Sequence, residues 1–412
     1  MYKEGIPVNF QVKKNIDELD PVAIASNLVK IPSFSFMENQ EKEVAEYIFN
    51  LFTEEGIEVY MDEVKPGRPN VVAKLKGKGG GQSLMFLGHT DTVPIYDMKD
   101  ALSGTTKDGL LHGRGSCDMK GQIAAMIAAM IAIKKSGISL KGDLYFAGVI
   151  DEEQTGSGVD YLVNNGPIAD ATIVGEATNL KVARGQKGLE WIEIIVLGKK
   201  VHGSSKDKGI NAIEMASRLI QKIYGELVPR LEERTHEVLG PPTINVGTIE
   251  GGDQPSTVPG KCIIRLDRRC VPGETIAQVY EELNQLVKEL HEEDSQFEAI
   301  VKDMFDGKLT PHLPFYLEED ESLIQAVKRV LDNTTTKDGD CGNSDWLTVM
   351  YAWTDAGILA NYTPSKCIIF GPGELTTAHS PVECIKEDEL LKGAYLYGEI
   401  ALEYCEIDGG KN

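Results

Sequence analysis

Apolar residues form short continuous runs at several places along the chain, and such runs are typical of buried strands. They lie at 84–87 and 144–150, and the mainly apolar segments 171–174 and 366–370 are also expected to be strands. Strands that alternate with helices favour an α/β fold. Asp20 followed by Pro21 is typical of a helix start, and helices are expected at 20–29, 41–55, 122–136, 321–331 and 387–404.

The pattern changes after residues 184–188. Residues 191–197 alternate apolar and charged positions, as a half-exposed strand does. From there the expected order is strand, helix, strand, strand, helix, strand, at 191–197, 211–224, 244–249, 261–267, 276–290 and 297–301. This order suggests an inserted ferredoxin-like module. Since 412 residues are too many for one ordinary core, we expect a discontinuous domain of residues 1–185 and 299–412 and an inserted domain of residues 186–298.

Some of the strands expected in the discontinuous domain are followed by a histidine or an acid. His89 and Asp91 follow the run 84–87, and residues i and i+2 of an extended segment point to the same side. His89 can therefore bind a metal through one ring nitrogen while Asp91 orients the ring; a hydrogen bond within the loop is the alternative. Glu176 follows the run 171–174. Because ligands of α/β proteins bind beyond the carboxyl ends of the strands, we expect a site there.

Acids at two further places have both a structural and a functional interpretation. Asp118 precedes the helix expected at 122–136, where a carboxylate is a routine N-cap. Asp151, Glu152 and Glu153 end the strand 144–150. Three neighbouring acids repel one another unless a cation or protons neutralise them, so a site and a solvated loop are both open. The glycine-rich segment 77–81 lacks the ending of a phosphate loop, which argues against nucleotide binding.

Composition narrows the choice of partners and compartment. The formal net charge of −22 argues against nucleic acid and against an anionic membrane surface as partners. The longest apolar run, 123–133, is about half of what a membrane span needs, and the first residues hold no apolar stretch typical of a signal peptide. Seven cysteines, an odd number without a Cys-x-x-Cys pair, fit reduced thiols better than disulfides. We therefore expect a cytoplasmic globular protein.

Five segments, in chain order, together resemble the metal-site motifs of the M20 metallopeptidase and amidohydrolase family. That family includes acetylornithine deacetylase, succinyl-diaminopimelate desuccinylase, aminoacylases and carboxypeptidase G. The resemblance spans roughly residues 20 to 405 and is carried by Gly88-His89-Thr90-Asp91-Thr92-Val93, Gly113-Arg114-Gly115 with Asp118-Met119-Lys120-Gly121, Asp151-Glu152-Glu153, Gly175-Glu176-Ala177-Thr178 and Ala378-His379-Ser380-Pro381.

The resemblance implies two divalent metal ions per chain, with Asp118 as the bridging ligand. His89 and Glu176 would be end ligands of different ions, and Glu153 and His379 would complete the set. Each ion then has one histidine, one terminal carboxylate and the shared Asp118. Imidazole and carboxylate ligands without a thiolate suit zinc, with cobalt or manganese as alternatives.

The resemblance also implies roles for residues that bind no metal. Glu152 would transfer protons, while Asp91 supports His89. His202 would stabilise the oxyanion from the partner subunit of a homodimer formed through the inserted domain. Asn245 and Arg269 match positions that bind a substrate carboxylate, with Arg268 as the neighbouring alternative, and Gly373 would allow close approach of backbone to substrate. The implied architecture is a di-metal hydrolase domain with helices around a mixed sheet, plus the ferredoxin-like module as lid and dimerisation domain.

The expected function is metal-dependent hydrolysis of an amide bond in an N-acyl amino acid or a similar small carboxylate. A dipeptidase or carboxypeptidase of the same family is the alternative, and a metal-dependent binding protein without catalysis is the alternative of another class. Two residues depart from the family pattern, and the second of them concerns the substrate pocket. Cys117 precedes the bridging Asp118, and Trp346 follows the segment Gly342-Asn343-Ser344-Asp345, where a small residue and then arginine are common.

Overall fold

The computed structural model describes residues 9–334 and 346–408. The chain forms two compact units. Of the described residues, the larger unit comprises 9–185, 317–334, 346–350 and 354–408, and the smaller unit comprises 186–316 and 351–353. The sequence predicts that the insert ends at 298, but strand β14 (Glu298–Asp303) pairs with β9 (Gly188–Leu197) of the smaller unit. The chain therefore stays in the smaller unit until Tyr316, and the predicted boundary at 299 is wrong.

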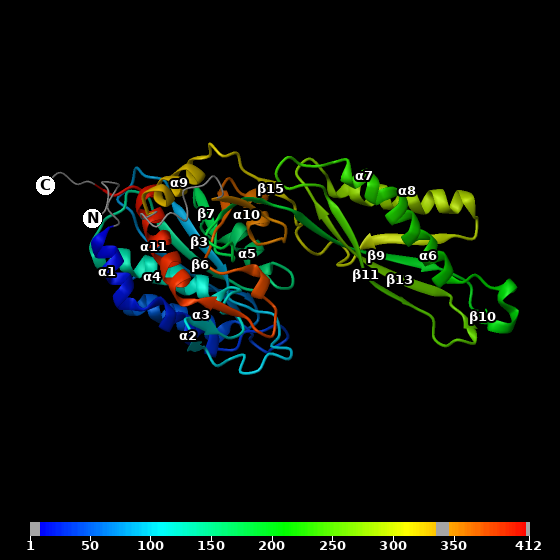
Figure 1. Ribbon diagram of the computed structural model, residues 1–412, viewed down its shortest axis with the longest axis horizontal. Helices are drawn as coiled ribbons and strands as arrows, with labels where there is room; N and C mark the ends of the chain where they lie inside the picture. The colour runs from blue at the N-terminus through cyan, green and yellow to red at the C-terminus, as the bar shows by residue number, and fades with distance from the viewer. Residues whose placement is uncertain (1–8, 335–345, 409–412) are drawn as a thin grey trace. The chain divides into compact units, whose positions relative to one another are not determined.

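A mixed sheet forms the centre of the larger unit (Figure 1). β3 runs parallel to β6 and to β7, and β17 runs parallel to β7, whereas β1, β2 and β8 pair antiparallel to their neighbours. The order is β1 (Glu58–Lys65), β2 (Arg68–Leu75), β6 (Leu144–Val149), β3 (Leu84–His89), β7 (Ala171–Val174), β17 (Lys366–Ile369) and β8 (Val182–Gln186), and β16 (Leu347–Met350) also pairs with β8.

Helices and one small sheet complete the larger unit. α4 (Lys120–Ser136) is buried from Lys120 to Ile133, because α1, α2 and α11 pack against it. The apolar run at 123–133 is thus part of the hydrophobic core of the unit. The other helices are α1 (Phe10–Leu19), α2 (Pro21–Lys30), α3 (Lys42–Glu54), α5 (Ser157–Asn165), α9 (Ser322–Thr334), α10 (Ala356–Tyr362) and α11 (Glu387–Tyr404), and the small sheet has the order β18 (Cys384–Lys386), β5 (Leu110–His112) and β4 (Thr105–Lys107).

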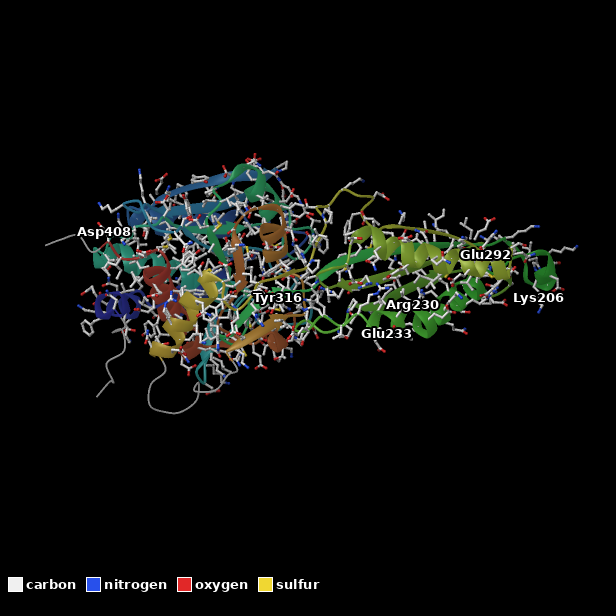
Figure 2. All side chains as sticks on the ribbon, turned by 90° about the horizontal axis from the view of Figure 1, so that it is seen from above. Lys206, Arg230, Glu233, Glu292, Tyr316 and Asp408 are labelled. Carbon is white, nitrogen blue, oxygen red and sulfur yellow. The ribbon has the colours of Figure 1, made fainter. Side chains whose placement is uncertain are left out.

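The smaller unit has the predicted ferredoxin-like order of elements. Its antiparallel sheet has the order β11-β13-β9-β14, and α6 and α8 pack on it through apolar residues such as Leu219 and Leu286. Charged side chains such as Arg230 and Glu292 are exposed on its helices (Figure 2). The bounds are α6 (Ala212–Lys222), α7 (Val228–Glu232), β11 (Thr243–Gly251), β13 (Lys261–Cys270) and α8 (Ile276–Glu293), with the short strands β10 (Val201–His202), β12 (Thr257–Val258) and β15 (Phe315–Tyr316).

Two further features bear on the expectations from composition. Within residues 9–334 and 346–408, no helix has the length and apolar character that crossing a bilayer requires. The described cysteines are free thiols, at positions 117, 262, 270, 367, 384 and 405.

Candidate metal centre and active site

Three neighbouring strands of the larger unit deliver side chains to one end of the sheet. His89 is the last residue of β3, Glu153 lies in the turn after β6, and Glu176 follows β7 by two residues. Because these strands are parallel neighbours, their carboxyl ends meet at one edge. Two loops complete the cluster: Asp118 lies just before α4, and His379 lies between β17 and β18.

Within the described part of the chain, two groups of side chains have the spacing of metal ligands. His89, Asp118 and Glu176 form one group, and Asp118, Glu153 and His379 form the other, with all ligand atoms of a group within 4.8 Å of one another. His89 Nε2 lies 3.0 Å from Asp118 Oδ1. His379 Nε2 lies 3.1 Å from Asp118 Oδ2 and 3.2 Å from Glu153 Oε1. The two oxygens of Asp118 therefore face different histidines.

The grouping corrects one part of the implied ligand set. The family resemblance implies that His89 and Glu176 bind different ions, but His89 Nε2 and Glu176 Oε1 are 3.6 Å apart and belong to one group. The reason is the strand order: β3 pairs directly with β7, which brings Glu176 beside His89. Glu153 thus shares its group with His379, and each group still has one histidine, one terminal carboxylate and Asp118.

Asp118 has no capping role in α4. The helix begins at Lys120, and its N-cap residue, Met119, makes no side-chain capping bond. The carboxylate of Asp118 instead contacts both histidines, and these contacts outweigh the effect of burial and lower the pKa of Asp118 below its usual range. Of the two interpretations of Asp118 open from the sequence, the geometry favours the metal ligand.

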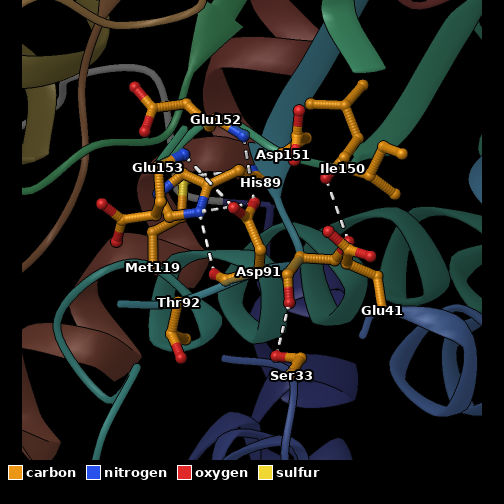
Figure 3. Close-up of polar contacts among 12 residues, drawn as sticks. Ser33, Glu41, His89, Asp91, Thr92, Met119, Ile150, Asp151, Glu152 and Glu153 are labelled. Carbon is orange, nitrogen blue, oxygen red and sulfur yellow. Dashed lines mark hydrogen bonds and ion pairs between the residues drawn. The ribbon is translucent and has the colours of Figure 1, made fainter. Parts of the chain in front are cut away.

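Asp91 contacts His89 and the turn that carries Glu152 and Glu153. His89 Nδ1 lies 3.0 Å from the Asp91 carbonyl oxygen and 3.5 Å from its carboxylate. An Nδ1–H that donates to this carbonyl leaves the Nε2 lone pair for a metal. The Asp91 carboxylate accepts the backbone N–H groups of Glu152 and Glu153, both at 3.2 Å (Figure 3). One residue thus fixes a ligand ring and the turn beside it.

Asp151 belongs to a structural ion-pair network. Its carboxylate accepts from Lys65 Nζ at 2.6 Å, Arg68 Nη2 at 2.8 Å and Ser157 Oγ at 2.8 Å. Arg68 also forms a two-pronged ion pair with Glu41, which is wholly buried. The three consecutive acids are therefore divided in role: two cations neutralise Asp151, Glu153 faces Asp118 and His379, and Glu152 lies outside both ligand groups.

The cluster brings several carboxylates together in a buried place, and bound cations would relieve the repulsion between them. Burial raises the pKa of Glu176 to about 8, and the Asp118 charge adds to this effect. Burial also raises the pKa of Glu152 well above its usual value, with Glu176 and Asp355 adding to the rise. Hydrogen bonds to Asp118 and Glu153 raise the pKa of His379 to about 10. Nitrogen and oxygen donors in two compact groups fit two divalent ions of the zinc, cobalt or manganese type.

Gly373 and Cys117 pack together beside the ligand loops. Gly373 has a φ of 94°, and a Cβ there would lie 3.0 Å from Cys117 Sγ. Cys117 is buried, and burial raises the pKa of its thiol. A buried thiol of this kind is inert packing. The close approach at Gly373 is to Cys117, and contact of Gly373 with substrate stays a prediction.

The remaining predicted residues lie on the smaller unit. His202 is exposed at the end of β10, and its Nδ1 contacts Ser204 Oγ at 2.7 Å. Asn245 lies opposite Asp267 in the sheet, and Asp267 binds Arg269 through contacts of 2.7 and 3.0 Å. The roles of these residues toward substrate stay predictions.

Arg268 and Trp346 serve the packing of their units. Arg268 is 1% exposed and pairs with Glu274 at 2.5 Å, so it is a structural residue and the alternative to Arg269 falls away. Trp346 packs against the core of the larger unit, with Lys328 over its ring. The segment 342–345 before it lies outside the described residues.

Two buried acids near the cluster are not among the residues predicted from the sequence. Asp355, at the start of α10, is 1% exposed, and its carboxylate oxygens have no hydrogen-bond partner among the described residues. Burial raises the pKa of Asp355 to about 8. His89 opposes this rise, and the Asp91 charge adds to it. Glu383, four residues after His379, is wholly buried. The sequence signal for Glu383 is its place two residues after the His379 motif, which ends at Pro381.

Comparison with known proteins decides the family. The model of peptidase family M20/M25/M40 matches residues 85–403. The chain belongs to this family. It is 29% identical over 402 residues to the acetylornithine deacetylase of Erwinia tasmaniensis, covering 93% of this chain and 97% of that one.

Solved structures show the same fold for this M20 chain. The aminopeptidase PepT of Bacillus cereus matches with a TM-score of 0.75 at 21% identity, covering 94% of this chain and 98% of that one. The YXEP protein of Bacillus subtilis, a dinuclear metal binding peptidase from the M20 family, matches with a TM-score of 0.68 at 18% identity, covering 95% and 98%. The family resemblance and the α/β fold with its inserted module are confirmed.

Proposed function

We propose that this M20 hydrolase removes the acyl group from an N-acyl amino acid or a similar small carboxylate, using two divalent metal ions. The observation that carries the proposal is the pair of ligand groups that share Asp118, with Glu152 beside them and outside both. The similarity to acetylornithine deacetylases over 93% of the chain supports a deacylase.

Glu152 is the proposed proton carrier. Two divalent ions, when bound, would lower the pKa of a water and polarise the substrate carbonyl. Glu152 accepts a proton from the attacking water and returns it to the leaving nitrogen. Its backbone is held by Asp91, and the adjoining Asp151 is fixed by Lys65 and Arg68, so its position is set from two sides.

We also propose roles for three residues of the smaller unit. We assign binding of the substrate carboxylate to Asn245 and Arg269, since a guanidinium suits a planar carboxylate. His202 would donate a hydrogen bond to the developing oxyanion across a homodimer formed through the smaller unit. The exposure of His202 supports a role toward a second molecule.

The proposal is tested by a screen of hydrolysis with the full chain loaded with zinc, cobalt or manganese. We expect turnover of N-acetyl or N-succinyl amino acids, abolished by a chelator and by Glu152→Gln. Cleavage of dipeptides without any deacylation would favour the dipeptidase or carboxypeptidase alternative, which the fold shared with the aminopeptidase PepT supports. Tight metal binding without any turnover would favour a binding protein.

A further inference from the structure

The buried carboxylate of Glu383 accepts hydrogen bonds from the backbone of the loop that carries Asp118. Glu383 Oε1 accepts three backbone N–H groups, from Gly115 at 2.9 Å, Cys117 at 3.0 Å and Asp118 at 3.1 Å. A carboxylate that accepts several backbone N–H groups forms charge-assisted bonds, which are stronger than neutral ones. The peptide N–H of Asp118 itself is therefore fixed by a residue of another loop.

The second oxygen of Glu383 extends this contact to a third segment. Glu383 Oε2 forms an ion pair with Arg114 Nη1, and both side chains are buried. Arg114 Nε in turn donates to the carbonyl of Pro94 at 3.2 Å. Pro94 lies three residues after Asp91, so the Glu383–Arg114 pair also contacts the loop that follows His89.

Main-chain bonds place Glu383 where two ligand-bearing segments meet. The Glu383 carbonyl accepts the Gly113 N–H at 3.3 Å. The next residue, Cys384, pairs with His112 in the small sheet of β18 and β5. From this pair of strands, the segment after β5 leads forward to Asp118, and the segment before β18 leads back to His379. The two residues contact each other at 3.1 Å.

We propose that Glu383 is a positioning residue for the two-metal centre: it holds the Asp118 loop against the His379 loop, so that one carboxylate can serve both ligand groups. Nothing in this inference depends on the acyl substrate. It rests on the two-metal part of the proposed function, and it gives a role to a residue that belongs to neither ligand group.

The test compares metal binding by Glu383→Gln with binding by the wild type. Glutamine keeps the shape, but its amide cannot serve the three N–H donors and Arg114 together. Removal of such a supporting contact typically costs about 10- to 100-fold in metal affinity. We expect a loss of that size for zinc, measured by competition with a chromogenic chelator, and an altered visible spectrum of the cobalt-loaded protein. Asp388→Asn, at an exposed position in the first turn of α11, is the control and should match the wild type.

The outcomes separate this inference from the proposed function. Wild-type protein that fails to bind two ions would contradict the proposed function itself. Wild-type protein with two ions, together with a folded Glu383→Gln of unchanged affinity and unchanged cobalt spectrum, would overturn only the role of Glu383. If Glu383→Gln does not fold, the same titration is made with Glu383→Asp, which keeps the charge. Wild-type affinity in that variant, or failure of both variants to fold with metal present, would also overturn the inference.

Discussion

Arg68 donates to Asp151 across 2.8 Å, which places a cation directly behind the turn of Glu152 and Glu153. The same guanidinium pairs with the wholly buried Glu41. Replacement of Arg68 by methionine removes a cationic partner from two buried carboxylates, those of Glu41 and Asp151. Loss of one partner of a buried pair typically costs about 3–5 kcal/mol, and we expect about 3 here because Lys65 still serves Asp151.

Urea unfolding at neutral pH measures this cost. Lys42→Met is the matched control, since Lys42 forms an exposed i,i+4 pair with Glu46 at 3.8 Å. The control should lose no more than about 0.5 kcal/mol. Equal losses in the two variants would show that the Arg68 network contributes no more than a surface ion pair.

Asp118→Ala is expected to abolish binding of both ions, whereas Glu176→Ala should weaken the binding of one ion. The reason is that Asp118 belongs to both ligand groups and Glu176 to one. Elemental analysis after gel filtration gives the number of ions per chain. Two ions retained by Asp118→Ala would rule out the shared carboxylate.

Glu152→Gln separates chemistry from metal binding. Glutamine has nearly the same side-chain shape as glutamate, and Glu152 belongs to neither ligand group. The metal content should therefore stay at the wild-type value. We expect kcat to fall about 100-fold or more, as for a lost general acid–base group. A kcat within a few-fold of the wild type would mean that another group carries the proton.

The metal-free protein should lose stability as pH rises, and bound metal should cancel the loss. Glu176 has its pKa raised to about 8 in the fold, so it keeps a proton there that the unfolded chain releases above its ordinary pKa of 4.5. The pKa of His379 is raised from 6.5 to about 10. Its protonated ring therefore contributes stability that is fully present below pH 6.5 and is lost as the pH approaches 10. Both effects have the same sign.

Melting temperatures at pH 6 and pH 9, with chelator and with zinc, measure this effect. The metal-free protein should melt lower at pH 9, and zinc binding should release protons, which calorimetry in buffers of different ionisation enthalpy detects. A metal-free protein that is more stable at pH 9 than at pH 6 would contradict the pKa directions of both residues.

His202→Ala tests whether a site is shared between subunits. A lost oxyanion donor typically lowers kcat about 100- to 1,000-fold, and the metal content should not change. Mixing this variant with Glu152→Gln should restore activity, because in a mixed dimer one site carries neither defect. Subunit exchange shown by a tag without any return of activity would place His202 outside the partner's site.

Much of the larger unit follows from local sequence signals. The buried strands β3, β6 and β7 consist mainly of apolar residues, and Asp20 caps α2 by accepting the Ala23 N–H at 3.1 Å. α1 is missed because it buries only two apolar side chains, Val12 and Ile16, so its periodicity is weak. The three-residue strands β4, β5 and β18 are too short to show an alternation.

The division of labour among acids could not be predicted from residue types. Asp151 and Glu152 are neighbours of the same chemistry, and only the tertiary structure brings Lys65 and Arg68 onto the first of them. The pairing of His89 with Glu176 depends on the order of the strands in the sheet, which local sequence patterns do not contain. Asp355 and Glu383 gain their surroundings from segments more than 200 residues away.

The place of β17 in the central sheet sets an order of assembly during synthesis. β17 pairs with both β7 and β8, so the sheet lacks a middle strand until residues 366–369 have left the ribosome. His379 follows later still, whereas the sheet of the smaller unit is made from one stretch between Gly188 and Asp303. A nascent chain can therefore fold its insert while the surrounding domain is incomplete, and the ion-binding cluster is among the last parts of the molecule to form.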